Sequence, residues 1–367
     1  MTAELSFIVK RTDLRQARIV EDTPAPLDPG QVRLRIDSFA LTSNNITYGA
    51  FGEAMHYWDF FPCTPDDWGR IPVWGFADVV ESTVEGLPVG ERIYGYFPMS
   101  THVVLQPVQL TDSGFVDGAP HRSELHAVYN RYQRCRHDPL YDPAHEAQTA
   151  LLRPLYVTSF LIDDFLADNA FFGARQVILS SASSKTAYGT AFCLSRRRGS
   201  AQAVTVTGLT SRANRGFTEQ LGCYDAVRDY DDVASLPADV PTVYVDMSGS
   251  APVRAAVHGH FGDTLRYSCS VGGTHWTELG GGKGLPGPRP TLFFAPAQIK
   301  KRMGDWGPGG LNERIAEAWT AFMKPVTDPQ RPWLTVVRGH GPQEVERVYR
   351  ALIDGRSNPQ EGHLLSL

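Results

Sequence analysis

The sequence VILSSASSKTAYGTAFCL, residues 177–194, carries the clearest signal of the fold. It begins with an apolar run typical of a buried strand, continues through a polar turn of small residues, and ends in a run with the composition of a helix. Strand, turn and helix in this order form the first half of a βαβ unit. The turn, however, contains none of the glycines that such turns commonly use, so its function has to be argued from the residues that replace them.

The same alternation continues downstream of this stretch. Short apolar, β-branched runs recur, and helix-like segments at residues 185–198, 211–221 and 251–261 lie between them. This pattern predicts an α/β domain with a doubly wound parallel sheet covered by helices on both faces. The strand-like runs read QVILSS, AVTVTG, TVYVDMSG and LRYSCSVGG.

The first hundred residues have a different texture, rich in strand signals and turn residues. Residues 32–42 alternate apolar and charged side chains, and Asp28, Pro29 and Gly30 supply a turn before them. Further strand-like runs follow at residues 73–81, 92–97 and 102–105. This half is therefore predicted to form an all-β barrel or sandwich, and the length of 367 residues agrees with two domains.

Composition excludes several classes of protein. The net charge of -5, with no long run of lysine or arginine, argues against nucleic acid as a main partner. No signal-peptide pattern opens the sequence, and charged residues interrupt the apolar segment at residues 151–172, so we expect a soluble, cytoplasmic protein that does not enter membranes. The five cysteines are scattered and never spaced as CxxC, which supports neither a disulfide framework nor a thiolate zinc cluster.

The polar turn suits a phosphate group. At the carboxyl end of a parallel strand, the N-terminus of the next helix presents backbone N–H groups and the positive end of its dipole. Residues 180–187 are small except Lys185, which adds a positive charge. A nucleoside-triphosphate loop is disfavoured because Leu179 and Ser184 stand where that motif needs glycine. We expect ordinary φ angles here and more reliance on Lys185, although a turn that only caps a helix remains an alternative.

The end of the second strand points to the phosphorylated form of a nicotinamide dinucleotide. Sites for NAD place an acidic residue about 20 residues beyond the first turn, whereas sites for NADP replace it with cationic or hydroxyl groups. Here Thr210, Ser211, Arg212 and Arg215 follow the strand, with no acidic residue before Glu219. This favours NADP, unless the arginines simply solvate the start of a helix.

Together these segments resemble the medium-chain dehydrogenase/reductase superfamily, in particular its zinc-independent quinone oxidoreductases and enoyl reductases. The resemblance extends over nearly the whole chain. It implies a GroES-like β-barrel domain at residues 1–150, a Rossmann domain at 151–294, and a C-terminal segment at 295–367 that returns to the first domain. The segments that carry it are LDPGQVRLRIDSFALTSNNITYG, LPVGERIYGYF, the opening stretch, AVTVTGLTSRANRGFTEQLGCYDAV, LRYSCSVGG and the terminal WLTVVRGHGPQEVERVYRALIDGRSNPQEGHLLSL.

Compared with this superfamily, the chain lacks zinc ligands. Asn44 and Asn45 occupy the segment where zinc-dependent members carry a cysteine, and Gly75, Phe76 and Ala77 replace a Gly-His-Glu motif. We therefore expect no metal, and reduction of an activated C=C or C=O bond by NADPH. By the same resemblance Tyr48 is the candidate proton donor, with Asn44 and Asn45 beside it, although Tyr48 could equally be a packing aromatic.

The resemblance also implies where the cofactor would bind. It places pyrophosphate contacts in the turn, 2′-phosphate contacts after the second strand, and further contacts near the adenine and nicotinamide. Like its relatives, the protein is a possible homodimer. The expected cofactor-binding residues are Ser183, Ser184, Lys185, Thr186, Thr210, Ser211, Arg212, Arg215, Tyr230, Met247, Ser248, Ser270 and Gly272.

The chain departs from the superfamily in a long segment at residues 116–152. Aromatic and polar residues are frequent there, and we interpret it as an insertion that shapes the substrate pocket, with a surface excursion packed on the barrel as the alternative. Its candidate substrate residues are Tyr129, Asn130 and Tyr132, together with Tyr156 just beyond. Such features suggest a divergent bacterial branch of unknown function.

Three functions are compatible with the sequence. The leading hypothesis is an NADPH-dependent reductase that acts on a small-molecule substrate in a cleft between the domains. The second is a lyase or eliminase that uses the nicotinamide transiently. The third is a redox-silent NADPH-binding protein, acting as a sensor or in an assembly, because a fold does not fix a function.

Overall fold

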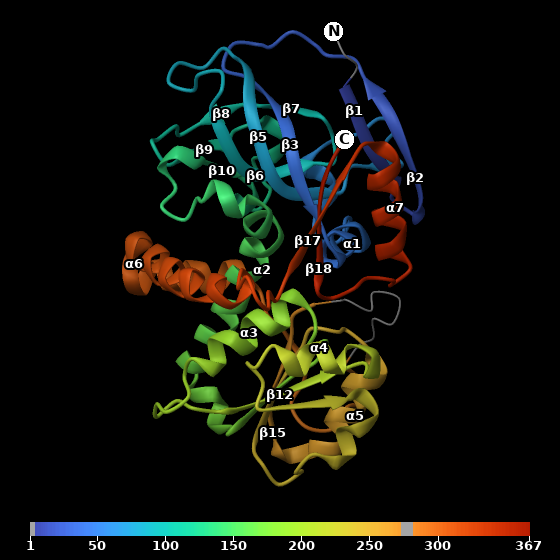
Figure 1. Cartoon of the computed structure of the whole chain (residues 1–367), viewed down its shortest axis with the longest axis vertical. Helices are drawn as coiled ribbons and strands as arrows, with labels where there is room; N and C mark the ends of the chain where they lie inside the picture. The colour runs from blue at the N-terminus through green and yellow to red at the C-terminus, as the bar shows by residue number, and fades with distance from the viewer. Residues whose placement is uncertain (1–3, 273–281) are drawn as a thin grey trace. The chain divides into compact units, whose positions relative to one another are not determined.

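The computed structural model describes residues 4–272 and 282–367 and divides the chain into two compact units (Figure 1). The first unit comprises Met1–Leu151 and Leu334–Leu367, and the second comprises Leu152–Trp333. The end of the chain returns to the first unit. Residues 295–333, which we expected in the returning segment, instead group with the second unit.

The first unit is built mainly from antiparallel strand pairs, whereas β17 and β18 at the edge of its main sheet run parallel. Its main sheet has the order β17-β18-β3-β5-β6-β10-β9-β8, with β7 also paired to β3, and a smaller sheet has the order β2-β1-β4. The strands are β1 (Glu4–Lys10), β2 (Asp13–Asp22), β3 (Val32–Leu41), β4 (Trp68–Gly69), β5 (Pro72–Ser82), β6 (Arg92–Pro98), β7 (His102–Leu105), β8 (Pro107–Val108), β9 (Gly114–Asp117), β10 (Arg131–Arg134), β17 (Thr335–His340) and β18 (Glu361–Ser366).

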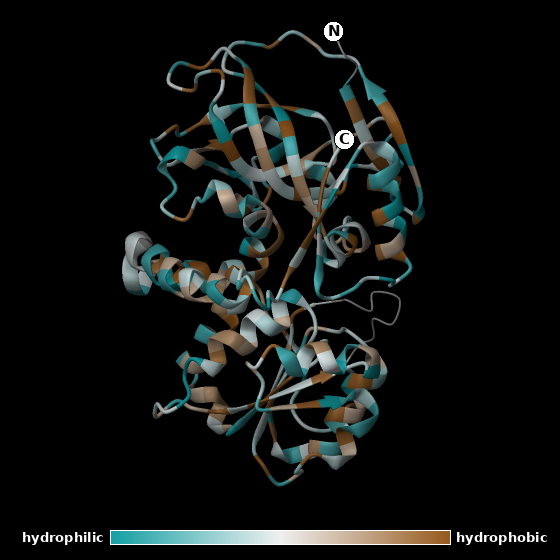
Figure 2. Ribbon diagram, viewed as in Figure 1, coloured by the Kyte–Doolittle hydropathy of each residue, from teal (hydrophilic) through white to brown (hydrophobic). Residues whose placement is uncertain are grey.

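The predicted alternation holds only in the middle of β3, where Leu34 and Ile36 are buried and Arg35 and Asp37 are exposed, whereas residues 38–41 are all buried. Gly75 in β5 allows the two strands to approach closely, because a Cβ atom there would lie 2.2 Å from the carbonyl oxygen of Ser38. Two helices, α1 (Ser43–Ala50) and α7 (Pro342–Ile353), belong to the unit. Helix α7 buries one apolar face and turns its charged face outward, a division visible as brown and teal in Figure 2.

The second unit is the predicted doubly wound domain. Its sheet has the order β13-β12-β11-β14-β15-β16, and every pair in it is parallel. All residues of β11 are buried, as expected for a central parallel strand covered on both faces. The predicted fold class is confirmed. The strands are β11 (Gln176–Leu179), β12 (Thr205–Thr210), β13 (Ala226–Asp229), β14 (Thr242–Asp246), β15 (Leu265–Ser270) and β16 (Thr291–Leu292).

Helices complete the second unit. A buried cluster that includes Ile178, Leu209 and Tyr244 from the sheet packs against Val257 and Phe261 of α5 (Ala251–Phe261). The other helices are α2 (Glu146–Asp168), which begins in the first unit, α3 (Lys185–Ser195), α4 (Arg215–Gln220) and α6 (Ala295–Val326).

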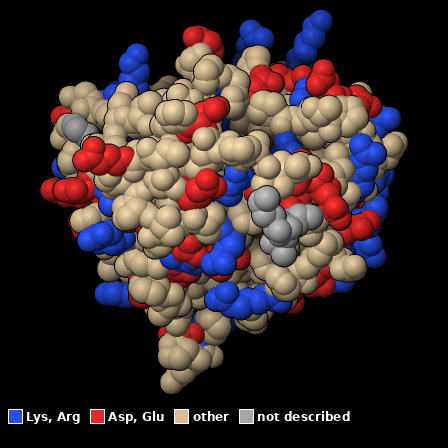
Figure 3. All heavy atoms as spheres, turned by 90° about the horizontal axis from the view of Figure 1, so that it is seen from above, with Lys and Arg blue, Asp and Glu red and all other residues tan. Residues whose placement is uncertain are grey.

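The distribution of surface charges and the lengths of the apolar helices agree with what the composition predicted. On the face shown in Figure 3, acidic and basic side chains are interspersed, without an extended basic patch. Among the helices formed by residues 4–272 and 282–367, none combines the length and the apolarity needed to cross a membrane.

Candidate functional site

Small polar residues form a tight turn between β11 and α3. Ser184 is the N-cap of the helix, and its side-chain oxygen accepts from the backbone N–H of Ala187 at 3.4 Å. The N–H of Ser184 itself donates to the carbonyl of Ser181 at 2.7 Å. Lys185 and Thr186 form the first turn of α3, both half-buried. The sequence therefore starts a helix at the carboxyl edge of the sheet, where a helix N-terminus favours an anion.

One expectation about this turn was wrong. Ser181 adopts φ 50°, in the left-handed region that we expected a glycine-free turn to avoid. Its backbone N–H donates to the hydroxyl oxygen of Tyr230 at 3.1 Å, and Ser181 is buried. A non-glycine residue in this region costs on the order of 1 kcal/mol, which the hydrogen bond to Tyr230 helps to offset.

A buried carboxylate fixes the neighbouring loop against the turn. The Ser180 hydroxyl donates to Asp246 Oδ1 at 2.9 Å, while the backbone N–H groups of Met247 and Ser248 donate to Ser180 Oγ at 3.0 and 3.1 Å. On its other side Asp246 accepts from Arg254 Nε at 2.9 Å, and both side chains are buried. Asp246 therefore links the ends of β11 and β14 at one edge of the sheet.

The end of β15 joins the same edge. Ser270 pairs in register with Asp246. Gly272, two residues later, packs against the loop that begins at Met247 after β14. A Cβ atom at Gly272 would lie 2.8 Å from the carbonyl oxygen of Met247, so this close approach requires glycine. Met247, Ser248 and Gly272 are thus gathered beside the polar turn.

The segment after β12 contacts the turn through hydroxyl and amide groups. Thr210 Oγ1 and Asn214 Nδ2 each donate to Ser183 Oγ at 3.3 Å. Beyond them, Arg212 Nε lies 3.3 Å from Asp229 Oδ2, and Arg215 donates to Glu219 at 2.9 Å. The segment that carries Arg212 and Arg215 therefore contacts the polar turn through Thr210 and Asn214.

Asp229 also lies at this carboxyl edge of the sheet, but it was not among the cofactor-binding residues predicted from the sequence. It ends β13 and pairs in register with Thr210, although the two residues are far apart in the chain. Its side chain lies beside both arginines, because Arg215 Nη1 is 3.9 Å from Asp229 Oδ1. In the sequence no acidic residue follows β12 before Glu219, whereas the parallel pairing of β12 with β13 brings Asp229 to the end of β12.

In the first unit, Tyr48 on α1 lies within a cluster of aromatic rings. Its ring centroid is 4.6 Å from that of Tyr57, 5.8 Å from that of Tyr96 and 6.4 Å from that of Tyr129. Burial, and secondarily the neighbouring Tyr57, raise the pKa of Tyr48 well above its usual value. A hydroxyl of this kind stays protonated and can donate a hydrogen bond, but it is a poor base.

The two asparagines beside Tyr48 differ in their surroundings. Asn45 Oδ1 accepts from the backbone N–H of Thr42 at 2.8 Å, and Asn45 Nδ2 donates to the carbonyl of Pro72 at 2.9 Å. Asn45 therefore caps α1 and ties it to β5. Asn44 is only half-buried, so the structure leaves it nearer to the surface than Asn45.

The insertion adds Tyr129 to the aromatic cluster. Its hydroxyl lies 3.3 Å from that of Tyr57, and its ring centroid lies 4.7 Å from that of Tyr96. Burial raises the pKa of Tyr57 and of Tyr129 above the usual value. Among the residues described, the buried hydroxyl of Tyr96 has no hydrogen-bond partner. Tyr57 and Tyr96 were not singled out from the sequence, because neither belongs to a recognisable motif.

The other predicted substrate residues have partners within the protein. Tyr132 donates to the carbonyl of Tyr96 at 2.6 Å, and Asn130 Nδ2 donates to the carbonyl of Arg122 at 3.1 Å. Tyr156 belongs to the second unit, where its hydroxyl donates to the carbonyl of Ala318 at 2.8 Å and its ring stacks on Phe322. Of the predicted substrate residues, Tyr129 therefore lies against Tyr48 within the first unit, and Tyr156 packs within the second.

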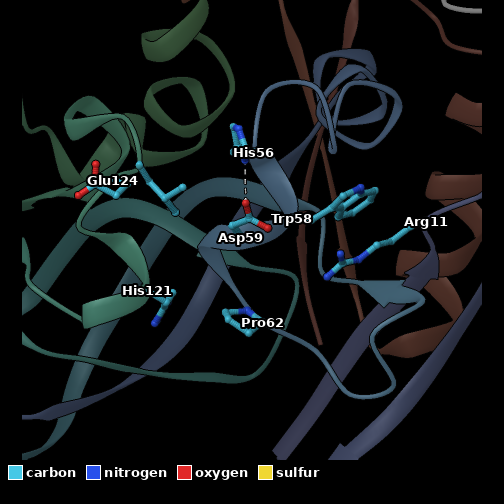
Figure 4. A pocket seen from close by; sticks show the side chains of 8 residues that line it. Arg11, His56, Trp58, Asp59, Pro62, His121 and Glu124 are labelled. Atoms are coloured by element: carbon cyan, nitrogen blue, oxygen red, sulfur yellow. Dashed lines mark hydrogen bonds and ion pairs between the residues drawn. The ribbon is translucent and has the colours of Figure 1, made fainter.

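A surface hollow of about 430 Å³ lies elsewhere in the first unit (Figure 4). His56 Nδ1 lies 3.0 Å from Asp59 Oδ2, and Arg11 lies beside Trp58 at the other end. No group of three or more potential metal ligands occurs within the described ranges. Phe76 and Ala77, at the position of the superfamily zinc motif, are fully buried core residues.

Comparison with solved structures shows the fold. CurA from Vibrio vulnificus in complex with NADPH matches with a TM-score of 0.60 at 14% identity, over 99% of this chain and 98% of that one. The quinone oxidoreductase from Coxiella burnetii matches with a TM-score of 0.52 at 14% identity, over 100% of both chains. The yhdH oxidoreductase from Salmonella enterica in complex with NADP matches with a TM-score of 0.51 at 14% identity, over 99% of both.

Sequence comparison is less informative about activity. No curated protein matches the sequence. Residues 39–358, however, match the family described as "Protein of unknown function (DUF2855)". This match covers most of the chain, so the protein belongs to the DUF2855 family and has the two-domain fold of the reductases above.

Proposed function

We propose that this protein is an NADPH-dependent oxidoreductase that transfers hydride to an activated C=C or C=O bond of a small molecule. The observation that carries the proposal is the carboxyl edge of the second unit. There, a helix N-terminus, a hydroxyl-lined turn and two arginines lie together in a fold shared with proteins solved with NADPH and NADP. This donor set suits the pyrophosphate and the 2′-phosphate of the cofactor.

The residues at this edge divide into two groups. Ser183, Ser184, Lys185 and Thr186 would contact the pyrophosphate, and Ser211, Arg212 and Arg215 would contact the 2′-phosphate. Their chemistry fits the group, because hydroxyls, a primary amine and guanidinium groups all donate hydrogen bonds to phosphate oxygens. When bound, NADPH supplies the hydride.

Tyr48 is the proposed proton donor to the reduced substrate. Its raised pKa keeps the hydroxyl protonated, so it would donate to the oxygen on which negative charge develops. Tyr96 supports this assignment, because its buried hydroxyl has no partner among the described residues, which costs about 1–3 kcal/mol unless a ligand supplies one. Tyr57 and Tyr129 provide further hydroxyls within the same cluster.

The aromatic cluster also indicates the kind of substrate. Tyr48, Tyr57, Tyr96 and Tyr129 supply ring surfaces and neutral hydroxyl groups. Such surroundings favour a flat, uncharged conjugated carbonyl compound over a highly charged one.

The test combines binding with turnover. Purified protein is titrated with NADPH, and oxidation of the nicotinamide is then followed with enones, quinones and acyl thioesters for the wild type and for Tyr48→Phe. We expect at least one substrate class to consume NADPH, and Tyr48→Phe to retain NADPH binding while losing turnover. Saturable NADPH binding with no oxidation in any class would favour the redox-silent alternative, whereas product formation without net NADPH consumption would favour the lyase.

A further inference from the structure

The carboxyl edge of the sheet in the second unit, where we propose that NADPH binds, contains the acidic residue Asp229. Its negative charge would oppose binding of the 2′-phosphate. The side chain of Asp229 is 9% exposed, compared with 86% for Arg212 and 39% for Arg215. A buried carboxylate thus lies beneath two exposed guanidinium groups. Glu219 pairs with Arg215 in addition, so the two arginines have two acidic neighbours.

The two oxygens of Asp229 are not equivalent. Oδ2 accepts from Arg212 Nε at 3.3 Å. Oδ1 has no hydrogen bond from any residue in the described parts of the chain, and the nearest ion pair to it is Arg215 Nη1 at 3.9 Å. A buried carboxylate oxygen without a donor is energetically costly, and a ligand hydroxyl group would remove that cost.

The position of Asp229 indicates which hydroxyl could reach it. Asp229 ends β13 beside the end of β12, and the next residue, Tyr230, binds the Ser181 N–H in the polar turn. In a doubly wound domain the adenosine ribose of a dinucleotide binds at the end of the second strand, which here is β12, and Asp229 pairs with the last residue of that strand. A ribose 2′-hydroxyl donates a hydrogen bond, whereas a 2′-phosphate carries negative charge and would be repelled by the carboxylate.

We propose that Asp229 determines the cofactor specificity of this site, by accepting a hydrogen bond from the ribose hydroxyl of NADH and by weakening the attraction of Arg212 and Arg215 for NADPH. The site therefore accepts both nucleotides, with only a modest preference for NADPH. This inference rests on the proposed function, because it requires a nicotinamide dinucleotide at this edge.

The experiment measures binding of NADPH and NADH by isothermal titration calorimetry, which does not depend on an identified substrate. Asp229→Asn removes the charge with little change in shape, and Asp231→Asn removes the same charge from an exposed position two residues away. We expect Asp229→Asn to bind NADPH more tightly and NADH more weakly, changing the ratio of the two dissociation constants roughly tenfold or more. The Asp231→Asn ratio should match that of the wild type.

Other outcomes are equally decisive. Weaker NADPH binding by Asp229→Asn would show that Asp229 instead positions the arginines, and an unchanged ratio would show that it does not select the cofactor. Either result overturns the inference. If the wild type binds neither nucleotide, the proposed function fails as well, whereas NADPH binding with an unchanged ratio leaves that function intact. Should Asp229→Asn not fold, Arg212→Gln provides a second test, because it should weaken NADPH binding and spare NADH.

Discussion

The backbone N–H of Ser181 donates to the hydroxyl oxygen of Tyr230 at 3.1 Å, and Ser181 holds a φ angle of 50°. This contact joins the turn after β11 to the residue after β13. It explains how a turn without glycine reaches a backbone conformation that glycine adopts most easily. Burial raises the pKa of Tyr230 to about 12, so the hydroxyl remains neutral at physiological pH.

The strain at Ser181 gives a first prediction. Ser181→Gly should increase the free energy of unfolding by about 0.5–1 kcal/mol, because glycine adopts positive φ without steric cost. Chemical denaturation measures the change. Ala182→Gly is the matched control, since Ala182 is not among the residues with positive φ, and it should be destabilising. A loss of stability in Ser181→Gly would show that the strain is not relieved there.

Tyr230 gives a second prediction. Tyr230→Phe removes the acceptor of the Ser181 N–H and should lower the free energy of unfolding by about 1–3 kcal/mol. It should also weaken nucleotide binding, because the turn loses its support. Thermal unfolding with and without NADPH measures both effects. Stability and affinity equal to those of the wild type would show that water replaces the hydroxyl without cost.

The buried pair of Asp246 and Arg254 gives a third prediction. Asp246→Ala leaves Arg254 buried without its carboxylate partner and should lower the free energy of unfolding by about 3–5 kcal/mol. Asp231→Ala, at an exposed position, should change it by less than about 0.5 kcal/mol. Urea denaturation distinguishes these values. A small change in the free energy of unfolding for Asp246→Ala would mean that the loop beginning at Met247 is not held in place by Asp246.

Tyr48 gives a fourth prediction, on pH dependence. Because the pKa of Tyr48 is raised, the hydroxyl stays protonated as the pH rises through the usual range for tyrosine. Turnover that depends on this proton should therefore be retained at pH values near 10, where an exposed tyrosine would be half ionised. The measurement is a pH profile of kcat with any substrate found by the screen. A fall centred well below 10 would exclude Tyr48 as the group that controls the reaction.

Much of the fold could be predicted because it depends on local patterns. The alternation of β3 and the strand–turn–helix order around Ser184 follow from side-chain periodicity and helix capping. The boundary predicted at residue 294, between the Rossmann domain and the C-terminal segment, was harder to predict from the sequence. Helix α6 groups with the second unit through contacts such as that of Tyr156 with Ala318, and those contacts leave no local signal in the sequence.

The candidate site was predictable only in part, for a related reason. Ser183 and Arg212 follow strands of the sheet directly, so the parallel topology alone predicts that they lie near one another. Asp229 and Tyr129 reach their neighbours through long-range contacts between segments with no shared motif. Asn45 was predicted as a site residue beside Tyr48, but the sequence did not reveal that its amide would cap a helix.

NADPH binding at the carboxyl edge of the sheet in the second unit can be measured by calorimetric titration of the wild type and of the double variant Arg212→Gln/Arg215→Gln, in low salt. The proposal predicts saturable binding of one NADPH per chain by the wild type. It also predicts an affinity at least roughly tenfold weaker in the folded double variant, because charge-assisted contacts to the 2′-phosphate are lost. Equal affinity of the two proteins, or no binding by the folded wild type, would contradict the claim that this edge of the sheet is an NADPH site.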